Sequence, residues 1–253
     1  MNYFTSIKNN YYFSWQIELL IESFKSHNLQ NQLYISLDSD EILDNCHNLK
    51  NHKNIIIGND YGGELNKPCR LLEAMESNFV GLPVTLIHPD MVLKNPLNKF
   101  AEDIICSVSI DDDDDDDDDD ELYLIKKEIV DNSYSFLPIG NIVVFNSFNS
   151  IIFLKGLIGY YNELLLKQNN VEKTALFKNL YSFYNQFSIK LEPMESTLLH
   201  NEFNSNFIHY KYGVPPTFMK HKFEETHPYE ILKTFDATDN LKYISKLVEK
   251  LVF

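Results

Sequence analysis

The sequence predicts an α/β protein with a mostly parallel central sheet that helices cover on both faces. Two observations support this prediction. Short apolar runs of strand length alternate with longer segments of helical period along the first half of the chain. One of these runs, Val84–Ile87, is apolar or β-branched at every position, as expected for a strand buried on both faces of a sheet. Such alternation predicts parallel strands joined by right-handed crossovers.

Two helices and five strands are predicted in the first half. The segment Tyr12–His27 has apolar residues spaced as on one face of a helix. Pro68 suits the first turn of a second helix, which we expect to end at Ser77. Asp38–Asn51 is rich in turn-forming residues and is expected to be a loop. The expected strands are Asn2–Ile7, Leu33–Leu37, Asn54–Ile57, Val84–Ile87 and Ile104–Val108.

The second half of the chain is less regular. Two strands, Glu121–Ile125 and Asn141–Phe145, are expected to pair like a hairpin across a loop at Asp131–Gly140. Asp239 suits the N-cap of a final amphipathic helix over residues 239–253. The remaining expected elements are helices at Ser150–Leu166 and Glu172–Phe187 and a strand at Phe207–Tyr210.

Length and composition indicate one globular domain. The chain has 253 residues, of which 44% are hydrophobic and 13% aromatic, enough to bury a core over residues 1–253. No apolar run approaches the about 20 residues of a membrane-spanning helix, and the N-terminal residues lead into a strand rather than a signal peptide. We therefore expect a soluble chain with no membrane span.

The cysteines and the amino-acid composition bear on the cellular compartment and on the source genome. Cys46, Cys69 and Cys106 are odd in number and lack the spacing of a metal site, so we expect buried free thiols in a reducing, cytoplasmic setting. Arg70 is the only arginine, whereas Tyr, Phe, Asn, Ile and Lys are abundant. This bias points to an A/T-rich genome, a viral one among the candidates.

An unbroken acidic run dominates the net charge. Asp111 to Asp120 supply ten of the fifteen net negative charges. Because adjacent carboxylates repel one another and disfavour strands, we expect a solvated loop; the alternatives are a cation-binding loop or an interaction segment. Metal sites need neutral ligands and varied geometry as well as carboxylates, which favours the loop. The acidity also argues against a nucleic-acid partner.

The most informative segment follows the strand Val84–Ile87. His88-Pro89-Asp90 ends the apolar run abruptly, and apolar residues resume at Met91. Asp90 is therefore expected at the carboxyl end of a buried strand, where open α/β sheets bind their ligands. A carboxylate in that place must be hydrogen-bonded, paired or bound to a metal. The alternative is an ordinary Pro-Asp turn.

Four short motifs in a fixed order resemble a known enzyme group. They are Asn-Tyr-Tyr-Phe-Ser-Trp-Gln (10–16), Leu-Asn-Lys-Pro (65–68), His-Pro-Asp-Met (88–91) and Ile-His-Tyr-Lys-Tyr-Gly (208–213). This order resembles the hydroxyproline O-arabinosyltransferase and peptidyl-serine galactosyltransferase group of GT-A glycosyltransferases, over roughly residues 1–223. The resemblance implies a GT-A, Rossmann-like fold and transfer of a sugar from a nucleotide-diphosphate sugar to an acceptor hydroxyl.

The resemblance also implies a divalent-metal site. Asp90 matches the last carboxylate of the family's Asp-x-Asp motif, which holds Mn²⁺ or Mg²⁺, and His209 would be the second protein ligand. The first aspartate of that motif is His88 here; a neutral imidazole can still ligate Mn²⁺ or donate a hydrogen bond. We expect the side chains of Asp90 and His209 to converge on one metal ion, with His88 close by. The alternative for each is a structural hydrogen bond.

Further residues are candidates for binding the donor. The resemblance places the nucleobase against Phe4, Thr5 and Ser6 on the first strand. Lys67 precedes a predicted helix N-terminus, a place suited to phosphate, although a solvated lysine is an equal alternative. Lys220 and Lys222 follow the histidine motif and are weaker candidates for diphosphate contacts.

The catalytic base is the least determined part of the site. An inverting transfer needs a carboxylate that deprotonates the acceptor hydroxyl. Glu172, Glu192 and Glu195 are candidates because they lie between the Asn141–Phe145 strand and His209. The family's Glu-Met-Tyr element has no clear copy in this sequence.

Three functional hypotheses follow. The first is a metal-dependent glycosyltransferase acting on an unknown protein or glycan acceptor. The second is a catalytically silent GT-A-like binding or structural protein, which His88 would allow. The third is an unrelated α/β nucleotide-binding enzyme such as a nucleotidyltransferase, which ranks last because Gly62-Gly63 lacks the spacing of a phosphate-binding loop.

Overall fold

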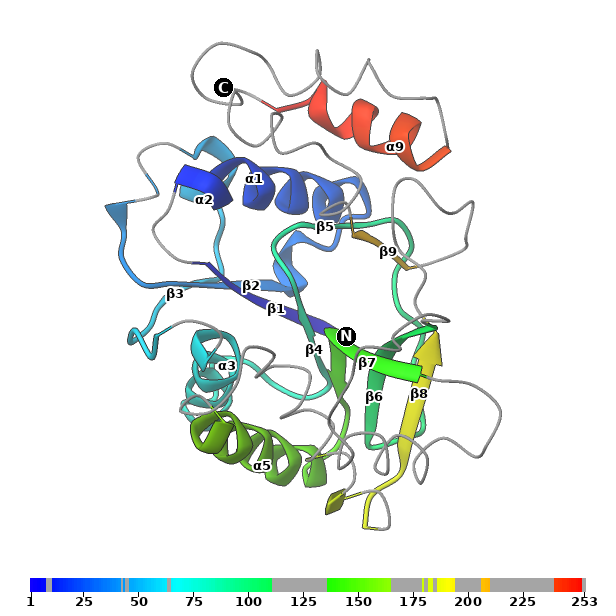
Figure 1. The fold of residues 1–253 in the computed structure, drawn as a ribbon. Coiled ribbons are helices and arrows are strands. Elements are labelled where there is room, and N and C mark those ends of the chain that lie inside the picture. The colour runs from blue at the N-terminus through cyan, green and yellow to red at the C-terminus, as the bar shows by residue number, and fades with distance from the viewer. Residues whose placement is uncertain are drawn as a thin grey trace. The chain divides into compact units, whose positions relative to one another are not determined.

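The structure is a computed structural model that describes residues 1–7, 11–41, 43, 46–62, 65–110, 136–164, 179, 182–183, 186–193, 206–209 and 239–251 (Figure 1). Its strands are β1 (Asn2–Ile7), β2 (Leu33–Leu37), β3 (Ile55–Ile57), β4 (Val84–Ile87), β5 (Met91–Leu93), β6 (Ile104–Ile110), β7 (Phe136–Phe145), β8 (Ile189–Pro193) and β9 (Phe207–His209). Seven of them form a sheet in the order β3-β2-β1-β4-β7-β6-β8, and β5 pairs with β9 in a separate sheet.

The larger sheet is mostly parallel. β1 runs parallel to β4, β2 to β3, and β6 to β8. Only β7 runs against its neighbours in the pairings described, since it is antiparallel to both β4 and β6. The α/β fold class with a mostly parallel sheet, predicted from the alternation of strand and helix patterns, is confirmed.

Five helices accompany the strands in the described part of the chain. They are α1 (Tyr11–Ser26), α2 (His47–Lys50), α3 (Asn66–Glu76), α5 (Asn149–Leu164) and α9 (Asp239–Val248), with a short 3-10 turn, η1, at Gln30–Gln32. The boundaries of α1, α3 and α5 lie within two residues of the predicted ones. Helix α9 starts at the predicted Asp239 but ends at Val248, whereas we expected it to continue to residue 253.

Several expectations from the sequence are corrected. The loop predicted at Asp131–Gly140 is wrong over residues 136–140, because β7 already begins at Phe136, and its residues 131–135 lie outside the described part of the chain. Pro138 and Gly140 suggested a turn, but Pro138 lies where β7 is paired with β6 alone, so its missing N–H is tolerated. Elements absent from the prediction are α2, within the expected loop 38–51, and the short strands β5 and β8. The predicted strand Glu121–Ile125 and most of the helix Glu172–Phe187 lie outside the described residues.

The chain divides into two compact units. Unit 1 consists of residues 1–4, 59–87 and 99–194, and unit 2 of residues 5–58, 88–98 and 195–253. Helices α3 and α5 lie side by side in unit 1, and in unit 2 helix α1 contacts α2, α9 and strand β5. The expectation of a single domain over residues 1–253 stays a prediction.

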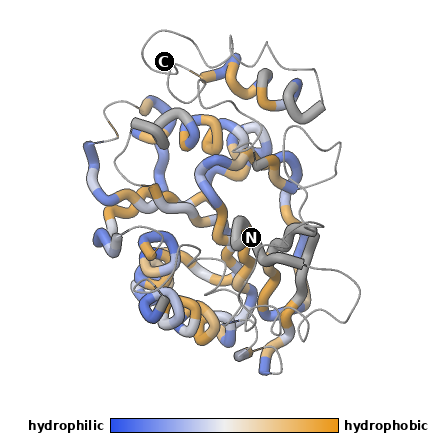
Figure 2. Tube along the Cα trace, in the orientation of Figure 1, coloured by the Kyte–Doolittle hydropathy of each residue, from blue (hydrophilic) through white to orange (hydrophobic). Residues whose placement is uncertain are grey.

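The apolar residues of the described strands and helices form the core. Val84 and Ile87 of β4 are fully buried and Leu86 nearly so, which agrees with the buried strand predicted from this run. On α9, hydrophobic and hydrophilic stretches alternate along the helix (Figure 2). Ile244, Leu247 and Val248 are its buried face, so α9 is amphipathic as predicted.

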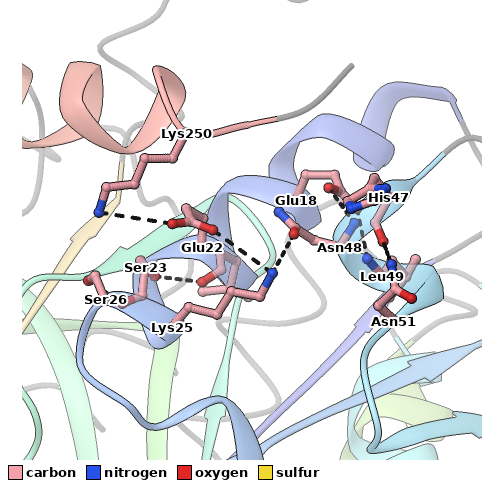
Figure 3. Close-up of polar contacts among 11 residues, drawn as sticks. Glu18, Glu22, Ser23, Lys25, Ser26, His47, Asn48, Leu49, Asn51 and Lys250 are labelled. Carbon is pink, nitrogen blue, oxygen red and sulfur yellow. Dashed lines mark hydrogen bonds and ion pairs between the residues drawn. The ribbon is translucent and has the colours of Figure 1, made fainter.

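A buried carboxylate joins α1 to α2 in unit 2. Glu18 of α1 is 4% exposed, and its two oxygens accept hydrogen bonds from the backbone N–H groups of Asn48 and Leu49, each at 2.8 Å (Figure 3). These N–H groups belong to the first turn of α2 and have no partner inside the helix. Glu18 therefore completes the start of α2 from a neighbouring helix.

Burial raises the pKa of Glu18 above its usual value, and the hydrogen bonds from Leu49 and Asn48 offset only part of that effect. Between the ordinary carboxyl pKa and the raised one, the folded protein keeps a proton on Glu18 that the unfolded chain releases. The free energy of unfolding therefore falls as pH rises through this interval. The two amide donors make the carboxylate tolerable at neutral pH.

The cysteines are free thiols, and Cys46 and Cys106 are buried as expected from the sequence. Cys69 is half-buried. Complete burial raises the pKa of Cys106 to about 12, so its thiol stays protonated and unreactive at neutral pH.

We predict that Glu18→Gln lowers the free energy of unfolding by about 1–3 kcal/mol, because a carboxamide has one acceptor oxygen for two buried N–H groups. The decrease in stability with rising pH just above the ordinary carboxyl pKa should also disappear in this variant. Urea unfolding at several pH values measures both effects. Glu22→Gln, one turn along α1, is the control because its two ion pairs are long, at 4.0 Å each. Equal stability of the two variants would contradict the role of Glu18.

Candidate functional site

The candidate site begins where β4 ends. His88 follows Ile87 directly, Pro89 and Asp90 form a turn, and β5 starts at Met91. Asp90 is 7% exposed and His88 is half-buried. The sequence therefore predicted correctly that Asp90 follows the carboxyl end of a buried strand. A buried carboxylate at such a place needs a compensating partner, and a cation is one that suits it.

The pairing of β5 with β9 brings a distant histidine to the same place. The two strands are antiparallel, and His209 lies opposite Met91 (Figure 1). Facing Cα atoms in an antiparallel pair are about 4.5–5.5 Å apart. The backbone of His209 is thus adjacent to the residue that follows Asp90, although 119 positions separate Asp90 from His209 in the sequence. The structure describes His209 only as backbone, so the convergence of its imidazole with the Asp90 carboxylate stays a prediction.

The ligand types at this site fit a divalent cation. A carboxylate from Asp90 with imidazoles from His88 and His209 gives oxygen and nitrogen donors, a set that Mn²⁺ accepts. Among the residues whose side chains are described, no group of three or more His, Cys, Asp and Glu could hold a metal ion. A three-ligand site at the Asp90 turn would therefore need a ligand from outside the described side chains, and His209 is the candidate for it.

The first strand holds the expected nucleobase-contacting residues. Phe4 and Thr5 are fully buried and Ser6 is partly exposed. The Thr5 hydroxyl is buried and has no hydrogen-bond partner in the described part of the chain. Thr5 and Ser6 belong to unit 2, together with His88 and Asp90, and Phe4 belongs to unit 1.

Lys67 was expected just before a helix N-terminus; it lies inside the first turn of α3, in unit 1, because the helix already begins at Asn66, and it is half-buried. The preceding Asn66 ties the helix start to the turn before it. Its Oδ1 accepts a hydrogen bond from the Tyr61 N–H at 2.6 Å, and its Nδ2 donates to Asp60 Oδ1 at 2.8 Å. The same Asp60 oxygen accepts from the N–H of Gly62, whose φ of +79° suits a glycine.

Arg70 is a residue whose place the sequence did not reveal. It lies one turn after Asn66 in α3, is 2% exposed, and donates from Nε to the Asn59 carbonyl at 2.8 Å. Its rarity was the one available signal, since it is the single arginine of the chain. A buried guanidinium holds the segment between β3 and α3 in place and puts a permanent positive charge in unit 1.

The remaining candidate residues are not located by the structure. Glu192 lies in β8, where its backbone pairs with Ser107 of β6, and its side chain is outside the described atoms. Glu172, Glu195, Lys220 and Lys222 lie outside the described residues, as does the acidic run 111–120. Their roles stay predictions.

No helix in the described part of the chain is both long and apolar enough to span a membrane.

Comparison with known proteins gives matches in structure but not in sequence. No protein-family model matches the chain, and no curated protein matches its sequence. Among solved structures, the galactosyltransferase LgtC in complex with donor and acceptor sugar analogs is similar, with a TM-score of 0.51 at 9% identity, covering 100% of this chain and 97% of LgtC. An active-site mutant of LgtC gives a TM-score of 0.50 at 11% identity, with the same coverage of both chains.

A third solved structure gives a similar result. A glycosyltransferase involved in glycosylation of the major capsid of PBCV-1 has a TM-score of 0.50 at 6% identity, covering 83% of this chain and 93% of that one. At such low identities the likeness concerns the fold. The strand order, the mostly parallel sheet and these structural neighbours together show that the chain has the α/β fold of the GT-A glycosyltransferases.

Proposed function

We propose that this protein is a divalent-metal-dependent glycosyltransferase that moves a sugar from a nucleotide-diphosphate sugar to an acceptor hydroxyl. The observation that supports this most is the register of β5 and β9. It sets the backbone of His209 opposite Met91, next to the buried Asp90, at the end of β4. An aspartate just after the end of an inner strand and a histidine on the strand paired with the next one, in a fold of this class, suit a metal that binds a diphosphate.

The roles of the residues follow from the chemistry of the leaving group. Asp90 and His209 would ligate Mn²⁺ or Mg²⁺, with His88 as a third ligand or a hydrogen-bond donor. When bound, such a metal neutralises the charge that develops on the departing nucleoside diphosphate. A buried Asp90 suits this task because it is held by a turn between two buried strands and its carboxylate needs little reorganisation.

The other candidate residues complete the proposal. Thr5 and Ser6 would contact the nucleoside, and Lys220 and Lys222 would contact phosphate oxygens. Lys67, in unit 1, stays a candidate for binding phosphate. The acceptor hydroxyl needs a base, for which Glu172, Glu192 and Glu195 remain candidates. The hydroxyproline O-arabinosyltransferase and peptidyl-serine galactosyltransferase group, which the motifs resemble, suggests a protein hydroxyl as acceptor.

A second candidate function rests on one observation. His88 occupies the position where the resembled family has its first aspartate, and the loss of one carboxylate lowers the charge available to a cation. A protein that binds nucleotide sugars without transferring them would tolerate this change. Release of nucleoside diphosphate by the unmodified chain separates the two functions.

The first test is Asp90→Asn. We expect it to weaken Mn²⁺-dependent binding of a nucleoside diphosphate by at least about 100-fold, since changes to residues that merely support metal ligands already cost 10–100-fold. Titration calorimetry with UDP and GDP, with and without Mn²⁺, measures this effect. Asparagine has nearly the same shape as aspartate, so the melting temperature without metal should change little. Asp40→Asn, an exposed position of the same unit, is the control. Equal binding by Asp90→Asn and the parent would rule out Asp90 as a ligand.

The second test is His88→Asp. A carboxylate at this half-buried position adds an oxygen ligand with a negative charge, which suits Mn²⁺. We expect equal or tighter Mn²⁺ binding and at least the parent's rate of nucleoside diphosphate release from a panel of sugar donors. Asn98→Asp adds the same charge at an exposed position of unit 2 and should have no effect. If the parent and both site variants release no nucleoside diphosphate from any donor with Mn²⁺, the transferase proposal fails.

A further inference from the structure

The short strand β5, which follows the Asp90 turn, is held differently on its two edges. One edge pairs with β9. On the other edge, both backbone polar groups of Leu93 bind side-chain hydroxyls. The N–H of Leu93 donates to Ser23 Oγ of α1 at 3.0 Å, and its carbonyl accepts from the Tyr243 hydroxyl of α9 at 2.6 Å.

This arrangement follows from the register of the small sheet. Leu93 lies opposite Phe207, and in an antiparallel pair alternate residues direct both polar groups away from the partner strand. Leu93 is fully buried, so water cannot satisfy these groups. Ser23 and Tyr243 therefore replace a neighbouring strand along this edge of β5.

Each hydroxyl is oriented by a second partner. Ser23 Oγ donates its proton to the Leu20 carbonyl at 2.6 Å, which leaves a lone pair for the Leu93 N–H. Tyr243 gives its single proton to Leu93, so His27 Nε2, at 3.2 Å, is a donor to the phenol oxygen. The C-terminal helix, the end of α1 and β5 thus share one hydrogen-bond network within unit 2.

We propose that Tyr243 and Ser23 are positioning residues for the Asp90 turn, so that docking of the C-terminal helix α9 sets the order of β5 and of the metal ligands beside it. The metal part of this inference rests on the proposed function. Asp90 is three positions before Leu93, and β5 is also the strand that pairs with His209. A displacement of β5 would therefore move both proposed ligands relative to His88.

The effect of the Tyr243 hydroxyl on β5 can be tested without changing the packing of α9. Ile244, Leu247 and Val248 are the buried apolar face of the helix, and none of them is altered by Tyr243→Phe. That variant keeps the aromatic ring and removes the hydroxyl, which donates to Leu93 and accepts from His27. Ser23→Ala removes the other hydroxyl from a different helix, so the two variants test the same strand from independent sides.

The first measurement is hydrogen exchange on the full chain without metal. We expect the segment 91–94 to exchange about five- to tenfold faster in Tyr243→Phe and in Ser23→Ala, as a lost buried hydrogen bond implies. Tyr160→Phe is the matched control, because its hydroxyl bonds Ser182 in unit 1, at 2.6 Å. Unchanged exchange at 91–94 in both variants, with folding verified by circular dichroism, would overturn the coupling.

The second measurement is the Mn²⁺ dependence of nucleoside diphosphate binding and release. Because Tyr243 acts only through β5, the Mn²⁺ concentration for half-maximal activity should rise about tenfold in Tyr243→Phe while kcat at saturating Mn²⁺ stays near the parent value. Faster exchange with unchanged Mn²⁺ dependence would overturn the positioning role. A parent that binds neither Mn²⁺ nor nucleotide overturns the proposed function and the metal part of this inference, and the exchange data then decide the coupling alone.

Discussion

The pairing of β5 with β9 is the constraint on which the candidate site depends. Three residues on each side form it, and all of the described side chains in the pair are buried: Met91, Val92, Leu93, Phe207 and Ile208. Because a shift by one residue would turn each side chain to the opposite face, burial of both strands fixes the register. With this register, His209 lies opposite Met91, the residue that follows Asp90. The proposed metal chemistry thus follows from an apolar contact between two segments that are far apart in the sequence.

Four buried or half-buried polar side chains complete backbone hydrogen bonding in the described part of the chain. Glu18 accepts hydrogen bonds from the first backbone N–H groups of α2, and Arg70 donates one to the Asn59 carbonyl. Ser23 and Tyr243 bind the backbone N–H and carbonyl of Leu93. Glu18, Ser23 and Tyr243 connect elements that are adjacent in space and distant in sequence, whereas Arg70 binds a residue 11 positions before it. Leaving any of these backbone groups unsatisfied would cost more than the bond itself contributes, so these side chains select one arrangement of the helices rather than adding much net stability.

The sequence predicted the elements whose signals are local. Helix α1 and strand β4 were found because periodicity and continuous apolar runs need no partner to be recognised. β5 was missed because a strand of three residues is defined by its pairing, and β8 was missed although it has five residues. The extension of β7 to Phe136 was hidden by Pro138 and Gly140, which also occur in turns. The position of Asp90 at a strand end was predictable for the same local reason.

The contact of β5 with β9 and the burial of Arg70 were not predictable from the sequence, because both depend on long-range packing. The resemblance of short motifs singled out His209 but could not give its register.

A site assembled in this way links ligand binding to folding. The proposed ligands come from the turn at 88–90 and from β9, two segments that are more than 100 positions apart in the sequence. Closing so long a loop has an entropic cost that grows slowly with its length, and it must be offset by contacts such as those of β5. A metal bound by both segments would act as a cross-link present only in the folded state, and would stabilise unit 2 by RT ln(1 + [metal]/Kd). The hydroxyls of Ser23 and Tyr243 also help to offset this entropic cost in the absence of metal, since they hold β5 in place before any ligand binds. Docking of helix α9 would therefore favour ligand binding, because less of the free energy of binding is spent on ordering β5.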